Sequence, residues 1–140
     1  MADDPLELVR IAASPTRLLI LKLLQQGFDH PEDLARKMKI RRQAVDKQLA
    51  ELFFWGLVDR SAESAPTGRP RILYFVTKRG ADLAALLEKA AGDFRASFRE
   101  DFERELADLE AKLAAGQIAE EMYFKKRKEI EARYKWVGSP

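Results

Sequence analysis

The chain has 140 residues, a net charge of +2, no cysteine and a single histidine, His30. This length suits one compact domain with an appendage; the missing cysteines exclude disulfides and iron–sulfur clusters, and one histidine disfavours a metal site, so we expect no cofactor. No apolar run approaches the ~18 residues of a membrane span and the start, Met1–Pro5, is acidic, so we expect a cytoplasmic protein with no membrane partner.

Two helices are predicted at the N-terminus. An apolar run follows Pro5 and ends before Ser14, which is expected to cap the second helix. Pro15 then stands at the first helical position, where a missing N–H costs nothing. Leucines all round this second helix, from Pro15 to about Gln26, predict a central position, and Gly27 ends it.

The next two segments predict a helix, a turn and a second helix. The first begins at Pro31 and has an apolar stripe of Leu34, Ala35 and Met38. The second begins near Arg41 or Arg42 and ends at Gly56. Its periodicity turns Ala44, Val45, Leu49 and Leu52 inward and leaves Arg42, Gln43, Asp46, Lys47 and Ala50 outward.

Two strands are predicted at residues 57–62 and 72–76, joined by turn-forming residues that make a hairpin with a basic tip. Thr77 is expected to cap a long helix in which apolar residues recur every three or four positions until Gly116. A last helix is predicted from about Ala119 to Trp136.

This order of elements predicts a mainly α (α+β) fold, a winged helix-turn-helix with a two-stranded β wing and a long C-terminal helical arm. We expect a DNA-binding domain at residues 1–91 and a helical dimerisation or interaction arm at residues 92–140. The charges agree with this division. Between Arg36 and Arg79 eleven basic residues stand against four acidic ones, whereas ten basic residues face eleven acidic ones from Asp93 onward.

Motifs in the first domain resemble the ArsR-like regulators, which are winged helix-turn-helix transcription factors. They are Ile11–Leu21 with its Ser-Pro-Thr-Arg segment, Val45–Leu49 followed by Leu52 and Gly56–Val58, and, similar to the wing of related regulators, Thr67–Arg71 before Tyr74 and Thr77. The resemblance covers about residues 5–90 and implies DNA binding. Metal-sensing relatives use cysteine or histidine pairs, which this chain lacks, and Asp46 and Gln48 stand where a serine and a histidine are usual.

A second resemblance lies near the C-terminus. Leu106, Leu109, Gly116–Glu121, Tyr123, Lys126 and Ile130 are similar to a short helical-hairpin (SHOCT-like) module, which is usually an oligomerisation element. Ala119 departs from that pattern, because a capping threonine is usual there. The resemblance implies a protein partner.

We expect the helix of residues 41–54 to enter the major groove of double-stranded DNA, and the basic wing of residues 64–71 to contact the backbone or the minor groove. The expected DNA-binding residues are Lys39, Arg41, Arg42, Gln43, Asp46, Lys47, Thr67, Gly68, Arg69 and Arg71. Arginine bonds guanine bidentately and glutamine does so with adenine. For Asp46 two roles stay open, accepting from a cytosine amino group or orienting Lys47 or Arg42.

A homodimer is expected, because two winged helices related by a two-fold axis read half-sites about one turn, ~34 Å, apart. The apolar stripe of the arm is expected to pack against the arm of a second chain. The expected dimerisation residues are Leu87, Phe94, Phe98, Phe102, Leu106, Leu109, Leu113 and Tyr123.

The expected function is therefore a sequence-specific transcription regulator that represses by steric exclusion. No catalytic set or phosphate loop is present, so we expect no enzyme. Two alternatives stay open: a winged-helix interaction module of a larger transcription or chromatin complex, and a nonspecific nucleic-acid-binding protein.

Other residues carry weaker expectations. Phe53-Phe54-Trp55 could be extra core, a patch covered by the C-terminal helices of the same or a partner subunit, which is favoured, or an effector pocket. Arg17 is expected to make a structural hydrogen bond or ion pair between helices, and His30 to be an ordinary helix-start residue.

Overall fold

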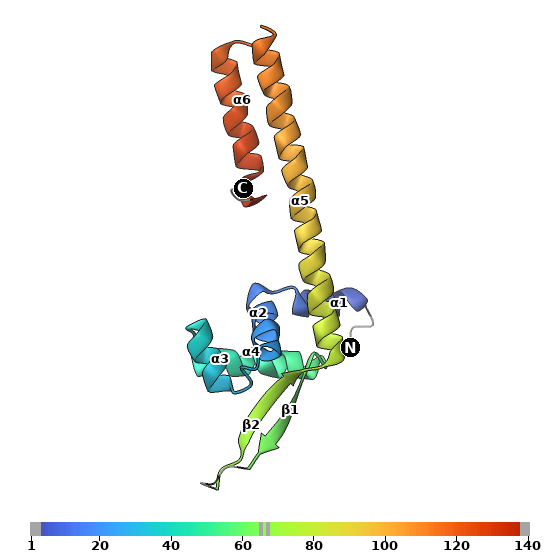
Figure 1. The fold of residues 1–140 in the computed structure, drawn as a ribbon, viewed down its shortest axis with the longest axis vertical. Helices are drawn as coiled ribbons and strands as arrows, with labels where there is room; N and C mark the ends of the chain where they lie inside the picture. Colours follow the sequence, from blue (N-terminus) through green and yellow to red (C-terminus); the bar gives the residue numbers. More distant parts are fainter. Residues whose placement is uncertain (1–3, 65, 67, 138–140) are drawn as a thin grey trace. The chain divides into compact units, whose positions relative to one another are not determined.

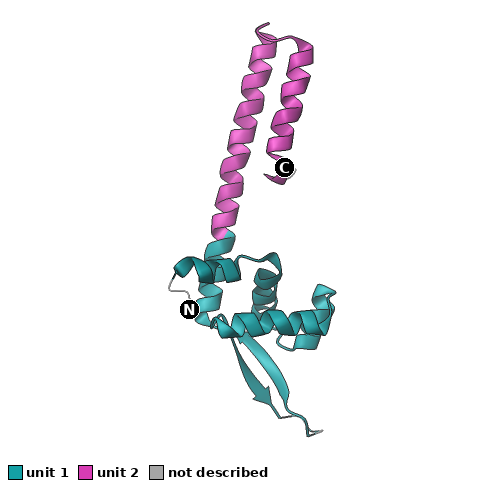
Figure 2. Ribbon diagram, turned by 180° about the vertical axis from the view of Figure 1, so that it is seen from behind, with its two compact units in different colours: residues 1–88 teal, residues 89–140 magenta. Residues whose placement is uncertain are grey.

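The computed structural model describes residues 4–64, 66 and 68–137. The chain divides into two compact units, Met1–Glu88 and Lys89–Pro140 (Figure 2). Within the described ranges, no helix is long and apolar enough to cross a membrane.

The first unit opens with three short helices, α1 (Pro5–Ala12), α2 (Pro15–Gln25) and α3 (Pro31–Met38) (Figure 1). Each begins at a proline, which has no N–H to leave unpaired in the first turn. Asp4 caps α1 by accepting from the backbone of Leu6, and Ser14 caps α2 by accepting from the backbone of Arg17. The predicted Ser14 cap is confirmed, and α2 ends within one residue of its predicted limit.

A fourth helix and the two strands of the wing follow. They are α4 (Arg42–Phe54), β1 (Val58–Glu63) and β2 (Arg71–Val76). Gly56, at φ 73°, ends α4 as predicted. The strands pair antiparallel, with Val58 opposite Val76. Their bounds lie within one residue of the predicted strands at 57–62 and 72–76. Tyr74 N donates to Asp29 O at 2.9 Å, which ties β2 to the loop before α3.

One apolar cluster holds this unit together. Its buried members come from the helices, the start of the wing and the next helix: Ala12, Ile20, Leu21, Leu23, Leu24, Leu34, Val45, Leu49, Leu52, Leu57, Val58 and Ala84. Because α2 supplies four of these side chains, it is central as its leucine pattern predicts. The observed architecture confirms the predicted mainly helical winged helix-turn-helix with a two-stranded sheet.

The wing leads directly into α5 (Lys78–Ala114). Thr77 caps this helix as predicted, since its Oγ1 accepts from Gly80 N at 3.0 Å. The same hydroxyl lies 2.8 Å from Gly56 O and 3.1 Å from Leu57 O, and can donate to either. A Cβ added to Gly80 would lie 2.0 Å from Leu57 O, so the first turn of α5 requires glycine for its close approach.

The second unit is an antiparallel helical hairpin. The later part of α5 runs beside α6 (Glu120–Arg133), which is followed by a 3-10 turn, Lys135–Val137 (Figure 1). Gly116, at φ 73°, forms the turn between the helices. The last helix ends at Arg133, before the predicted end at Trp136, because Tyr134 leaves the helical conformation as the C-cap.

Replacing Gly80 by alanine is expected to lower the free energy of unfolding by about 1–3 kcal/mol, because the new Cβ would collide with a backbone carbonyl. Urea unfolding followed by circular dichroism measures the change. Gly92→Ala is the control: it lies in the same helix with no atom within 4 Å of its added Cβ, so helix propensity should make it stabilising by roughly 0.5–1 kcal/mol. Equal effects of the two substitutions would contradict the close approach at Gly80.

Candidate nucleic-acid interface

A tight turn joins α3 to α4. Lys39 has φ 58° in the left-handed region, and its N–H donates to Arg36 O at 3.3 Å. Ile40 N donates to Ala35 O at 3.1 Å, so both residues close the end of α3 through their backbones. Lys39, an expected DNA-binding residue, is exposed in this turn immediately before α4 begins.

One face of α4 is fixed in the core. Val45, Leu49 and Leu52 are completely buried there. The side chains that remain exposed along the first half of α4 and just before it are Arg41, Arg42, Gln43, Ala44, Asp46 and Lys47. The prediction that Ala44 turns inward is wrong, because the three buried side chains at spacings of four and three define a face beside which Ala44 falls.

Arg17 holds α4 to the two N-terminal helices. Its Nε donates to Gln48 Oε1 at 2.8 Å, and its Nη1 donates to Ile11 O at 2.9 Å. The predicted structural hydrogen bond of Arg17 between helices is therefore confirmed. Gln48 takes part in this contact and is only half exposed, so it belongs to the support of α4.

Arg42, at the start of α4, is held by two carboxylates. Its Nε donates to Asp46 Oδ1 at 3.0 Å, one turn further along the helix, and its Nη1 donates to Glu32 Oε1 of α3. The hydrogen bond to Asp46 is the largest cause that raises the pKa of Arg42 above its ordinary value. Of the two roles left open for Asp46, orienting Arg42 is the one observed in the free chain.

The wing brings further arginines to the same place. A cleft of about 330 Å³ is lined by His30, Pro31, Glu32, Arg42, Arg69, Pro70, Arg71 and Ile72. Arg71 begins β2 opposite Glu63, and Gly68 stands in the turn at φ 89°. Of the predicted wing residues, Thr67 lies outside the described residues. The cleft thus joins the predicted α4 and wing sites through Arg42, Arg69 and Arg71.

His30 lies at the start of α3 among acidic side chains. Its Nδ1 is 2.8 Å from Asp29 Oδ1 and its Nε2 is 3.5 Å from Glu63 Oε2. It makes no side-chain cap on α3. In the part of the chain that the structure describes, no three histidine or acidic residues are arranged to hold a metal ion.

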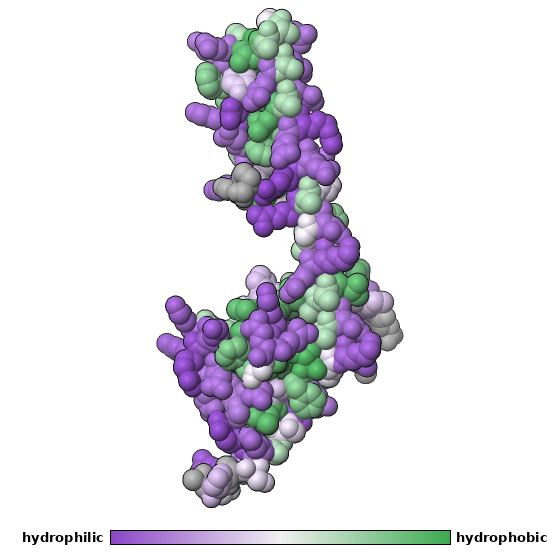
Figure 3. All heavy atoms as spheres, in the orientation of Figure 1, coloured by the Kyte–Doolittle hydropathy of each residue, from purple (hydrophilic) through white to green (hydrophobic). Residues whose placement is uncertain are grey.

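The aromatic segment at the end of α4 is divided among three environments. Trp55 packs against the core of the first unit. The guanidinium of Arg60 lies 4.2 Å from the centre of the Phe53 ring. Phe54 is 75% exposed, so the segment does not form extra core as a whole. Figure 3 shows hydrophilic side chains over the side of the first unit where α3 lies, with apolar surface in patches elsewhere.

Part of the stripe expected to bind a second chain is covered by α6 of the same chain. Leu109 and Tyr123 are buried. The ring of Phe102 lies 5.3 Å from that of Tyr134, and the ring of Phe98 lies 4.7 Å from that of Trp136. Leu87, Leu106 and Leu113 are half-buried. The chain folds back on itself and covers part of the stripe, while Phe94 remains 64% exposed; the packing of a partner arm on this stripe stays a prediction.

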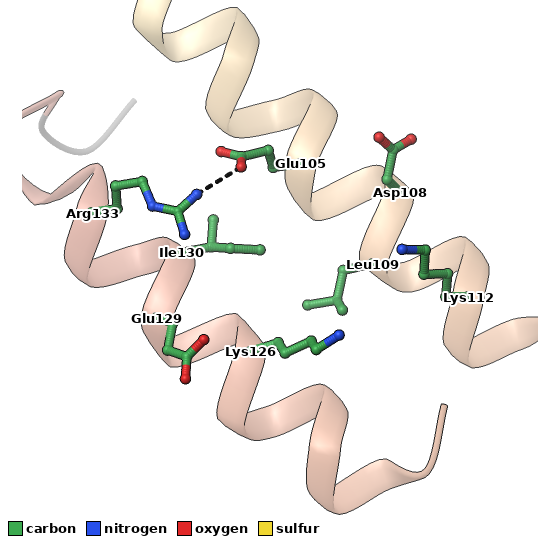
Figure 4. Close-up of a pocket in the computed structure, with 8 residues that line it drawn as sticks. All are labelled: Glu105, Asp108, Leu109, Lys112, Lys126, Glu129, Ile130 and Arg133. Carbon is green, nitrogen blue, oxygen red and sulfur yellow. Dashed lines mark hydrogen bonds and ion pairs between the residues drawn. The ribbon is translucent and has the colours of Figure 1, made fainter. Parts of the chain in front are cut away.

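Charged side chains border the contact between α5 and α6. Figure 4 shows Leu109 and Ile130 between the two helices, with Glu105 and Arg133 paired at 2.8 Å beside them. Lys126 and Glu129 line the same shallow groove. An alternating set of charges around a small apolar contact is typical of a solvated helical hairpin.

Sequence reasoning missed one residue of the candidate interface, Glu32. Its acidic side chain in the first turn of α3 has an ordinary explanation, since negative charge favours a helix N-terminus. The only further signal was the charge of the region: Glu32 lies four residues before Arg36, where the basic stretch begins.

Residues 15–101 match the HxlR-like helix-turn-helix family. Among solved structures, the chain is similar to the diamide-treated YodB from B. subtilis, with 17% identity and a TM-score of 0.58 over 66% of this chain and 90% of that one. It is also similar to a MarR-family regulator from Enterococcus faecalis V583, with 24% identity and a TM-score of 0.58 over 74% and 96%. A PadR-like regulator from Bacillus cereus gives 13% identity and a TM-score of 0.54 over 65% and 94%.

No curated protein sequence matches the chain. At these identities the structural neighbours establish the fold alone, which is the winged helix-turn-helix described above. The sequence match gives the family, and it is HxlR-like, whereas the motifs by themselves resemble ArsR-like regulators. Because the match runs from α2 into α5 and spans more than half of the chain, the protein belongs to the HxlR-like helix-turn-helix family.

Proposed function

We propose that this protein is a sequence-specific, double-stranded-DNA-binding transcription regulator that acts as a homodimer and represses by covering a promoter. The observation that carries the proposal is the cleft between α3, α4 and the wing, where Arg42, Arg69 and Arg71 gather. Membership of a helix-turn-helix family supports DNA as the ligand.

In this proposal α4 and the wing contact different parts of the DNA. Gln43 and Arg42 stand on the exposed first turn of α4, the part of a recognition helix that reaches base edges in the major groove. Arg41 and Lys47 flank them with positive charge for the phosphates. The wing arginines supply further backbone or minor-groove contacts, which fix the register of the protein on the duplex.

Dimerisation gives this small surface enough contact with DNA. We propose that residues 1–91 bind DNA and that the arm, residues 92–140, joins two chains. An apolar side chain that remains open on the arm supports this division: Phe94 is 64% exposed. Burial of such area against a second copy contributes about 25 cal/mol per Å² toward the cost of association.

The alternative of a pure protein-interaction module explains the charge placement less well. Such a module has no need of arginines on both α4 and the wing, whereas a polyanion ligand does. A nonspecific nucleic-acid-binding protein would use the same arginines but not Gln43, whose amide suits adenine. The first test below separates these cases.

Arg42→Ala and Gln43→Ala are each expected to reduce preference for the operator over random DNA by about 1–3 kcal/mol, because each removes a bidentate base contact. Fluorescence anisotropy with both duplexes, after selection of the operator from a random pool, measures this preference. Equal losses of affinity for both duplexes would exclude base reading by these residues.

Arg69→Ala and Arg71→Ala are expected to weaken operator and random binding together. Each should make the slope of log K against log salt shallower by about 0.9, the value for one phosphate contact. Arg10→Ala is the control, since Arg10 lies on α1 in an ion pair with Glu7 and should leave the slope unchanged. If the wing variants behave like this control, the wing does not touch DNA.

Phe94→Ser in the full chain is expected to weaken the dimer at least tenfold, because it removes an exposed apolar side chain from the proposed interface. Sedimentation equilibrium measures the dissociation constant. Leu6→Ser is the matched control and should leave the dimer intact, because Leu6 is a comparably exposed apolar side chain (69%) on α1, outside the proposed arm. An unchanged dimer in Phe94→Ser would move the interface away from this part of α5.

A further inference from the structure

The candidate DNA surface contains an acid where a polyanion ligand should bind. Glu32 is the only acidic residue among the eight described residues that line the cleft, and three of the others are arginines. Its carboxylate bonds Arg42 across a separation of ten residues, from α3 to α4. A carboxylate among arginines occupies the kind of position that a backbone phosphate takes in a protein–DNA complex.

A second carboxylate acts on the same arginine. Asp46 holds Arg42 Nε, so the guanidinium donates to both acids at once. The neighbouring cations differ in this respect. Across residues 4–64, 66 and 68–137, Arg41, Lys47, Arg69 and Arg71 make no ion pair. Neutralisation is therefore confined to the one α4 cation best placed to read a base edge.

We propose that Glu32 and Asp46 are internal competitors of DNA, which withhold Arg42 from phosphates and release it only where a guanine accepts it bidentately. This inference rests on the proposed function and adds a determinant of specificity to it. On random DNA a phosphate offers Arg42 charge-assisted hydrogen bonds of the same kind as the two that it already makes with Glu32 and Asp46, so exchanging one anion for another gains little. On the cognate site the guanine edge offers two hydrogen bonds in fixed geometry.

The geometry also gives Asp46 a role in the bound state. Once Arg42 turns to a guanine, Asp46 is an unpaired acceptor on the exposed face of α4. A carboxylate accepts from the amino group of cytosine and is repelled by phosphate. The pair therefore favours a half-site with a G·C pair under the first turns of α4. The exposure of both acids keeps their ion pairs with Arg42 weak enough for DNA to open them.

The test uses the full chain and a Glu32→Gln/Asp46→Asn double variant, which keeps the side-chain shapes and removes both negative charges. The matched control is Glu7→Gln/Asp82→Asn, which changes net charge equally and also frees two paired cations, Arg10 and Lys78. Anisotropy titrations with a random-sequence duplex over a range of salt concentrations give affinity and salt slope. The operator selected by the wild-type protein gives the specificity ratio.

The double variant is expected to bind random DNA on the order of fivefold more tightly than the control, with a salt slope steeper by about 0.9, as one added phosphate contact requires. Its preference for the operator should fall. Adding Arg42→Ala should abolish the gain; a gain that persists would mean that the carboxylates act only through net charge and would overturn the inference.

The remaining outcomes separate the two proposals. If the wild-type protein binds duplex DNA and the double variant binds random DNA no more tightly than the control, the inference is overturned while the proposed function stands. If neither the wild-type protein nor any variant binds duplex DNA at low salt, both are overturned.

Discussion

The orientation of α4 is the constraint on which the rest of the first unit depends. One face of α4 enters the core through Val45, Leu49 and Leu52. At the edge of that face, Arg17 donates a hydrogen bond to Gln48. The close packing of these apolar side chains fixes which face of the helix turns inward, and the hydrogen bond of the Arg17 guanidinium to Gln48 adds a directional contact. Turning α4 by one residue would leave buried polar groups unpaired, which is costly. The outward direction of its basic face therefore follows from what lies beneath it.

The exposed ion pairs of Arg42 contribute little to the stability of the fold. Ion pairs between half-exposed side chains contribute between nothing and about 1 kcal/mol, so the contacts of Arg42 with Glu32 and Asp46 add little to the fold. They do change what a ligand meets, because the surface offers fewer free cations than its sequence suggests. When acids neutralise cations on a nucleic-acid-binding surface, its nonspecific attraction for DNA phosphates is smaller. Hydrogen bonds to bases then contribute a larger share of the preference for one DNA sequence over another.

Local signals allowed the sequence to predict most of the fold. The caps at Ser14 and Thr77, the turn at Gly56 and the outward charges of α4 all depend on residues a few positions apart. Contacts between distant segments could not be predicted in the same way. Nothing near Glu32 in the sequence identifies Arg42 as its partner. The apolar stripe of α5 equally suited a second chain, and only the folded hairpin shows α6 of the same chain covering Leu109.

The hydroxyl of Thr77 restricts how this sequence can vary during evolution. It receives the Gly80 amide while facing the carbonyls of Gly56 and Leu57, so one oxygen serves the end of α4 and the start of α5 together. Valine has the same shape but would remove the acceptor for the Gly80 amide and the hydroxyl donor to Gly56 O, whereas serine keeps both; Leu57 O would still accept from the backbone N–H of Thr77. Homologues that retain this junction should accordingly carry a hydroxyl residue at this position even where the surrounding apolar side chains drift.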